Sequence, residues 1–157
     1  MKRGLAICGT LEIVIARSKR CGDIVRTAVD TNVLLDILLP DPAHEKMSLA
    51  LLHRALTEGT LCICEVVAAE LGAQFPAAES MERFLKEAGL VLSRTSLNAL
   101  HDAGRRWRRY ARKRTGTRDR VVADFMIAAH ALHEADRLLT RDLGFYRKHF
   151  ADLVLLQ

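Results

Sequence analysis

The sequence lacks the features that mark several large classes of protein. No uninterrupted apolar run approaches the roughly 18 residues that a membrane-spanning helix needs. The four cysteines include one C-x-C pair, Cys62 and Cys64, and no second pair at a metal-ligand spacing. P-loop, G-x-G-x-x-G and G-x-S-x-G motifs are all absent. These absences argue against a membrane span, a zinc site, those phosphate-binding loops and a serine hydrolase, and they favour small buried thiols at Cys62 and Cys64.

The chain has enough apolar residues for one core. It has 157 residues, of which 50% are hydrophobic and 27% are charged, and this length suits a single domain. Residues 1–24 form a loosely attached extension ahead of a domain that spans residues 25–157. The start of the chain resembles a signal peptide only faintly, because Glu12 interrupts its apolar segment. We therefore expect a cytoplasmic protein with no membrane contact.

Positive charge is concentrated in two segments. The net charge is +5, but residues 105–120 carry +8 and residues 1–26 carry +4, so that the rest of the chain carries −7. A basic strip on an acidic body suits a partner with phosphates, because lysine and arginine neutralise a phosphate backbone without reading its sequence. A solvated helix face is the alternative interpretation of the strip.

Short apolar strands alternate with helices along the chain. Strands are predicted at Ile24–Val29, Leu61–Cys64, Leu90–Leu92, Arg137–Thr140 and Leu153–Leu156. Helices are predicted at residues 43–57, 65–74, 77–88 and 120–135, with a further long helix that begins at Ser96. This alternation predicts an α/β fold, a three-layer α/β/α domain with a central parallel sheet of about five short strands. In such folds the functional crevice lies outside the carboxyl ends of the strands.

The long helix carries an apolar stripe close to a 3.6-residue period. Its members are Leu97, Leu100, Ala103, Trp107, Tyr110 and Ala111. We therefore expect Trp107 and Tyr110 to pack in the core rather than to stack on nucleic-acid bases.

Four carboxylates occupy positions that stability alone does not favour. Asp30 and Asp142 follow the first and fourth predicted strands, Glu70 shares a helix face with two valines, and Asp124 interrupts an apolar helix. Each could instead have a purely structural role. The two strand-end aspartates could cap a helix or a turn, and the other two carboxylates could form an ion pair with an arginine. Asp36, Asp119 and Asp136 are predicted to be exposed or capping residues.

Carboxylates that converge at strand ends repel one another unless a cation neutralises them. Oxygen-only ligands suit Mg²⁺ or Mn²⁺, and such an ion can assist attack of water on a phosphodiester. No histidine is needed as a base, and His130 is expected to be a packed or surface residue.

Four segments together resemble the PIN-domain ribonucleases. Ala28–Asp36 resembles the opening of that family, Val66–Leu71 its second acidic motif, Ala123–Ala131 its third and Leu139–Asp142 its fourth. The order and spacing agree over about residues 25–157. Within the family the sequence is most similar to VapC-type toxins of bacterial toxin–antitoxin pairs, including the tail Phe145–Phe150.

The resemblance implies a PIN-like fold and a Mg²⁺- or Mn²⁺-dependent endoribonuclease. Asp30, Glu70, Asp124 and Asp142 would form the acidic metal site, Asn32 would orient carboxylates, and Thr140 would hydrogen-bond a carboxylate or a bound water. A small antitoxin that inserts into the acidic groove and a homodimer are further implications. The residues expected to hold the RNA backbone are Arg105, Arg106, Arg108, Arg109, Arg112, Lys113, Arg114 and Arg118.

Two alternatives and one departure stay open. A non-catalytic nucleic-acid-binding or regulatory protein could use the same fold. A phosphoryl-transfer enzyme with Asp30 as nucleophile would want an aspartate at position 32, where Asn32 stands, and a basic residue beside the acids. VapC-type toxins usually begin near their first strand, so we hypothesise that translation starts at or near Val25 and that residues 1–24 are an artefact of the assigned start.

Overall fold

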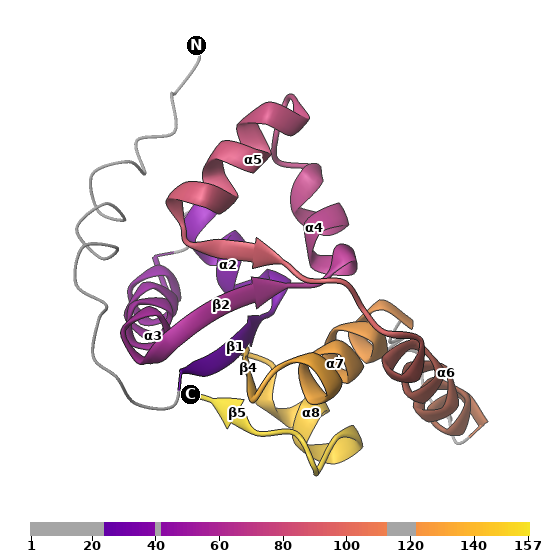
Figure 1. Ribbon diagram of the computed structural model, residues 1–157. Coiled ribbons are helices and arrows are strands. Elements are labelled where there is room, and N and C mark those ends of the chain that lie inside the picture. The colour runs from indigo at the N-terminus through magenta and orange to yellow at the C-terminus, as the bar shows by residue number, and fades with distance from the viewer. Residues whose placement is uncertain (1–23, 40–41, 113–121) are drawn as a thin grey trace.

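The centre of the molecule is a parallel sheet (Figure 1). The computed structural model describes residues 24–39, 42–112 and 122–157. Within these ranges five strands pair in the order β3-β2-β1-β4-β5, and every pairing is parallel. The strands are β1 (Val25–Val29), β2 (Gly59–Ile63), β3 (Leu90–Leu92), β4 (Arg137–Leu139) and β5 (Leu155–Leu156). The predicted parallel sheet of five short strands is confirmed.

Helices cover both faces of this sheet. Successive strand residues point to opposite faces, yet Thr27, Ala28 and Val29 of the central strand are all buried. The helices are α2 (Thr31–Leu38), α3 (Glu45–Glu58), α4 (Glu65–Gly72), α5 (Ala78–Glu87), α6 (Leu97–Arg112), α7 (Val122–Glu134) and α8 (Leu143–His149). α7 packs on β1 and β4, and α3 packs on β2. None of the described helices is both long and apolar enough to cross a membrane.

Glycine residues stand at the end of α3 and just after α5. Gly59 ends α3 as predicted, but β2 already begins there, two residues before the predicted strand. A Cβ at Gly59 would lie 1.9 Å from the carbonyl oxygen of Val25, so only glycine allows these two residues to pair. Gly89 has a φ of 65°, in the left-handed region, and ends the segment of α5 as predicted.

The apolar stripe predicted for α6 is buried only at Ala103 and, in part, at Tyr110. Leu97 is 80% exposed, and Trp107 and Ala111 are also exposed. The face that packs on α7 is centred on Ala99 and Ala103, since small side chains let two helices approach closely. Of the two aromatic residues that were expected in the core, Tyr110 is partly buried and packs on it, whereas Trp107 is exposed.

The predicted burial is correct for two cysteines and one histidine but wrong for one aspartate. Cys62, Cys64 and His130 are buried, as expected, and burial raises the pKa of both thiols. The prediction that Asp36 is exposed or capping is wrong, because its side chain is 4% exposed. Its Oδ2 accepts a hydrogen bond from Ser48 Oγ at 2.5 Å and pairs with Arg141 Nε at 2.8 Å, so a counter-charge compensates its burial.

Candidate active site

The predicted carboxylates come from four elements near the carboxyl ends of the strands. Asp30 follows β1 at the N-cap position of α2, and Asp142 follows β4 at the N-cap position of α8. Glu70 lies in α4, which follows β2, and Asp124 lies in the first turn of α7. The parallel order of the strands therefore brings together side chains that are far apart in the sequence.

Asp30 is held by hydrogen bonds from three side chains. Its Oδ2 accepts from Asn32 Nδ2 at 2.8 Å, Thr140 Oγ1 at 2.7 Å and Tyr146 OH at 3.1 Å. Although Asp30 occupies an N-cap position, its side chain makes no cap hydrogen bond. The carboxylate is thus aimed at the strand ends and not at the helix backbone.

Burial works against a negative charge on Asp30. The residue is 5% exposed, and burial raises its pKa above the ordinary value of 3.8, while the hydrogen bonds from Thr140 and Tyr146 oppose this shift. The nearby charge of Asp124 raises the pKa further. A cation beside these carboxylates would relieve both costs.

Glu70 and Asp142 each have a partner that fixes their side chain. Thr31 Oγ1 donates a hydrogen bond to Glu70 Oε2, which joins α2 to α4. Asp142 Oδ1 accepts from the Phe145 backbone N–H at 3.2 Å, so the predicted capping role is present at a residue that also lines the cavity.

One cavity of about 780 Å³ brings all four carboxylates together. Its lining consists of Asp30, Thr31, Asn32, Leu35, Glu70, Asp124, Ile127, Arg141, Asp142 and Tyr146. Asn32 therefore lies where it was expected, and Thr140 contacts the cavity through its bond to Asp30.

Besides two apolar residues, Leu35 and Ile127, the cavity lining includes three polar residues that were not predicted as site residues. Thr31 lies inside the Asp30–Asn32 motif, so its position beside two site residues was a usable signal. Tyr146 bonds Asp30 across 116 positions, and Arg141 pairs with Asp36, which the sequence placed at the surface. Arg141 likewise lies between two predicted site residues, Thr140 and Asp142. Its pairing with Asp36 and the bond from Tyr146 to Asp30 have no local sequence signal, because both contacts join elements far apart in the chain.

The donor chemistry of the cavity suits a hard divalent cation. The cavity offers carboxylate ligands, as Mg²⁺ and Mn²⁺ prefer, and the three side chains that donate to the buried Asp30 are all uncharged. Among the described residues, no three acidic, histidine or cysteine side chains already lie close enough to share an ion.

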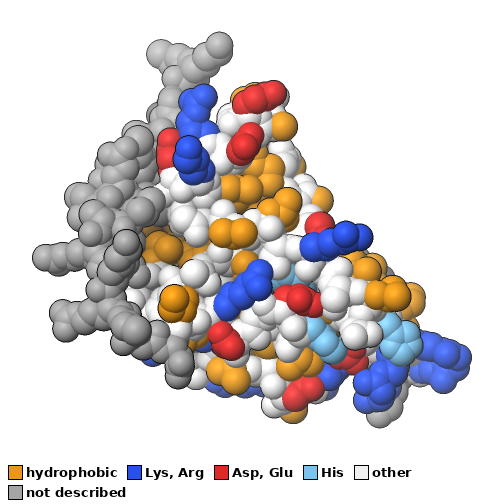
Figure 2. All heavy atoms as spheres, viewed as in Figure 1, with side chains coloured by type: hydrophobic (Ala, Val, Ile, Leu, Met, Phe, Trp, Pro, Cys, Tyr) orange, Lys and Arg blue, Asp and Glu red, His pale blue; other side chains and the backbone are white. Residues whose placement is uncertain are grey.

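The arginines of α6 fall into two groups. Arg105, Arg108, Arg109 and Arg112 are exposed, and Figure 2 shows basic side chains gathered over the end of this helix. Arg106 is different, because its side chain is 18% exposed and lies on the inner side of the helix. The remaining basic candidates, Lys113, Arg114 and Arg118, lie outside the described residues, as does Asp119.

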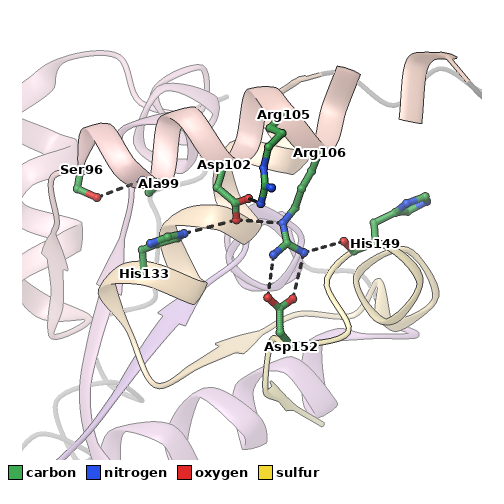
Figure 3. A network of polar contacts seen from close by, with 8 residues as sticks. All are labelled: Ser96, Ala99, Asp102, Arg105, Arg106, His133, His149 and Asp152. Atoms are coloured by element: carbon green, nitrogen blue, oxygen red, sulfur yellow. Dashed lines mark hydrogen bonds and ion pairs between the residues drawn. The ribbon is translucent and has the colours of Figure 1, made fainter. Parts of the chain in front are cut away.

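Arg106 ties α6 to the chain after α8 (Figure 3). Its guanidinium donates to Asp102 at 3.0 Å and, through two nitrogens, to both oxygens of Asp152 at 3.0 and 2.7 Å. It also donates to the His149 carbonyl at 3.1 Å and lies 4.5 Å from the centre of the Phe150 ring. These contacts give Arg106 a structural role in this packing.

The sequence as a whole decides which family this site belongs to. The PIN domain family matches residues 27–151. The chain belongs to the PIN domain family. The predicted family membership and PIN-like fold are thereby confirmed, and no curated protein matches the sequence.

Solved structures that resemble this PIN domain come from bacterial protein pairs. A chain of DNA-bound VapBC from Salmonella typhimurium is 22% identical, with a TM-score of 0.58, and the match covers 84% of this chain and 97% of that one. A chain of VapBC-1 from nontypeable Haemophilus influenzae is 19% identical, with a TM-score of 0.58 and coverages of 83% and 96%. A chain of FitAcB from Neisseria gonorrhoeae is 25% identical, with a TM-score of 0.56 and coverages of 83% and 96%. The PIN domain thus shares its fold with chains of such complexes.

Proposed function

We propose that this PIN domain is a Mg²⁺- or Mn²⁺-dependent endoribonuclease. PIN domains are in general nucleases, and the observation that carries the finer assignment is the single cavity that four carboxylates line. Such a cavity attracts divalent cations and repels a bare phosphate, so a cation is what would admit a phosphodiester there.

Asp30, Glu70, Asp124 and Asp142 would hold the ion. When bound, a divalent ion supplies the Lewis acidity that favours attack of water on a phosphodiester and stabilises the leaving oxygen. The chain's own contribution is to orient Asp30: Asn32 Nδ2 donates to Asp30 at 2.8 Å and to Thr140 Oγ1 at 3.2 Å. Thr140 Oγ1 in turn donates to Asp30 and accepts from the Asp142 backbone N–H at 3.1 Å.

The RNA backbone would lie along the exposed arginines of α6. α6 and α7 run antiparallel, because Tyr110 packs on Phe125 while Asp102 lies 3.4 Å from His133. The end of α6 that carries Arg109 and Arg112 therefore lies beside the first turn of α7, which contains Asp124. Arg106 is left out of this contact, because its guanidinium is bound to Asp102 and Asp152.

A toxin of a toxin–antitoxin pair is the biological role that fits these observations. The structural neighbours named VapBC and FitAcB support a small antitoxin as partner. A homodimer, a cytoplasmic location and a translation start near Val25 remain predictions. Intact mass of the native protein checks the last of these, and a mass that matches all 157 residues would contradict it.

The test of the proposed activity is cleavage of total cellular RNA by the purified protein. We expect discrete fragments with Mg²⁺ or Mn²⁺ and none with EDTA. RNA that is bound but left intact with either ion would instead favour a non-catalytic nucleic-acid-binding protein on the same fold.

A further inference from the structure

Arg141 brings one basic side chain to a cavity that is otherwise acidic. It lies between Thr140 and Asp142, and it lines the cavity together with the four carboxylates. Among the described residues that line this cavity, it is the only lysine or arginine. A positive side chain inside this cavity, unlike one on an open helix face, is placed where it could contact a bound ligand.

Both the backbone and the side chain of Arg141 are fixed. Its backbone N–H donates to Asn32 Oδ1 at 3.2 Å, and Asn32 also donates to Asp30. Its Nε pairs at 2.8 Å with Asp36, which is buried and also accepts from Ser48 Oγ. Helix α2 thus holds both the backbone and the guanidinium of Arg141, and Ser48 of α3 in turn fixes Asp36.

Because Arg141 contacts Asp36 through Nε, its Nη1 and Nη2 groups can bind another ligand. An arginine has five N–H donors, and four of them are on Nη1 and Nη2. In the part of the chain that the structure describes, the ion pair with Asp36 is the only one that Arg141 makes, and no described side chain accepts from Nη1 or Nη2. A flexible arginine beside four carboxylates would pair with one of them, and Asp36 holds this one away from them.

We propose that Arg141 binds a phosphate of the RNA that enters the acidic cavity, and that Asp36 and Ser48 position it. This inference rests on the proposed nuclease function, because it names the substrate group that the site would hold. Two N–H groups of a planar guanidinium match two non-bridging phosphate oxygens. Arg141 would therefore bind the phosphate at the cavity wall, while the carboxylates serve the ion.

The test must separate phosphate binding from simple neutralisation of Asp36. Arg141→Gln alone leaves a buried, unpaired carboxylate and risks unfolding. The informative pair is therefore Asp36→Asn and the double variant Asp36→Asn with Arg141→Gln, in which no buried charge is left without a partner. Arg54→Gln is the matched control, since Arg54 Nε also pairs with a carboxylate at 2.8 Å, on Glu58 at the end of α3 and away from the cavity lining.

Two readouts apply to each protein. Cleavage of total cellular RNA gives the activity, and anisotropy of a fluorescent mixed-sequence RNA gives binding, in an Asp124→Asn background that keeps the RNA intact. We expect the double variant to bind RNA about 10- to 100-fold more weakly than the protein with Asp124→Asn alone, the usual range for hydrogen bonds to a charged group. Asp36→Asn should lose only part of that affinity, because it keeps the guanidinium but removes the carboxylate that positions it. Arg141→Lys should restore part of this loss, and Arg54→Gln should change neither readout.

Failure of this inference differs from failure of the proposed function. If the double variant binds and cleaves RNA as Asp36→Asn does, Arg141 only neutralises Asp36 and the inference is overturned, while the nuclease assignment stands. If the unmodified protein cleaves nothing but the double variant still binds RNA more weakly than Asp36→Asn, the nuclease assignment fails and the phosphate site stands.

Discussion

Asp30 meets three hydrogen-bond donors and little solvent, which makes its charge costly to the folded chain. Burial raises its pKa above the ordinary value of 3.8. Between 3.8 and the raised value the folded state binds more protons than the unfolded state, so the free energy of unfolding falls as the pH rises through that range. The stability that Asp30 contributes is therefore highest in acid and is lost towards neutral pH.

Replacement of Asp30 by asparagine should stabilise the metal-free protein. At neutral pH and in EDTA, we expect Asp30→Asn to raise the free energy of unfolding by about 1–2 kcal/mol, because the variant has no charge to bury. The two proteins should become similar in stability below the ordinary pKa of aspartate. Urea unfolding across pH measures this, and a less stable Asp30→Asn at neutral pH would show that its hydrogen bonds outweigh its burial.

His130 has the opposite dependence on pH. It is 1% exposed, its Nε2 has no hydrogen-bond partner, and burial lowers its pKa below 6.5. Its contribution to stability is therefore complete above 6.5 and is lost as the pH falls towards the folded value.

The variant His130→Leu should remove this loss. As the pH falls from 6.5 towards the lowered pKa of His130, we expect the unmodified protein to lose up to about 1.4 kcal/mol per pH unit, and the leucine variant to lose less. His53→Leu, at an exposed position of α3, is the control and should keep the slope of the unmodified protein. An unchanged slope in His130→Leu would mean that another group controls acid stability.

At the scale of elements, α6 depends on a charged contact within its packed face. Arg106 joins Asp102 of its own helix to Asp152 beyond α8, and its ring contact with Phe150 adds to the packing. Arg105 also pairs with Asp102, at 3.0 Å, but its side chain is 60% exposed. The two arginines therefore offer a matched comparison.

We expect Arg106→Met to lower the free energy of unfolding by about 1–2 kcal/mol, because it removes the two-nitrogen contact with Asp152, the bond to the His149 carbonyl and one of the two arginine partners of Asp102. Arg105→Met should cost less than about 0.5 kcal/mol, as is usual for exposed ion pairs. Chemical denaturation gives both values. Equal effects would mean that the network around Arg106 adds nothing beyond surface charge.

The same helix shows where sequence patterns succeed and where they fail. Its start was predictable, since Ser96 Oγ accepts from the Ala99 backbone N–H at 3.2 Å as an N-cap should. Its buried face was predictable only in part: the apolar stripe included Ala103, which is buried, but also Leu97 and Trp107, which are exposed. The remaining buried positions, Ala99 and Asp102, are not part of a large apolar stripe. Helix α8 was not predicted either, since its seven residues are too few to establish a hydrophobic pattern with a 3.6-residue period.

At the scale of the whole molecule, the sequence predicted most of the acidic site and little of its support. Parallel strands place their carboxyl ends at one edge, so carboxylates after strands or at the starts of helices converge by topology. Tyr146 and the pair of Arg141 with Asp36 reach that edge through contacts between elements far apart in the chain. Such contacts have no local signature in a single sequence.

Charge is distributed unevenly across the molecule, and this has a measurable consequence for RNA binding. We expect charge reversal of Arg108, Arg109 and Arg112 to weaken binding of a fluorescent RNA and to flatten its dependence on salt, because backbone contacts release counterions. The unfolding midpoint should change little, since the three side chains are exposed. Unchanged binding would place the RNA elsewhere on the domain.

The central claim is that the acidic cavity hydrolyses RNA, and Asp124 tests it most directly. The measurement is metal-dependent cleavage of total cellular RNA by Asp124→Asn and by a control, Asp136→Asn, at an exposed aspartate that does not line the cavity. Asp124→Asn should remove cleavage while circular dichroism shows an intact fold, and Asp136→Asn should cleave as the unmodified protein does. Retained metal-dependent cleavage by Asp124→Asn would contradict the proposed site.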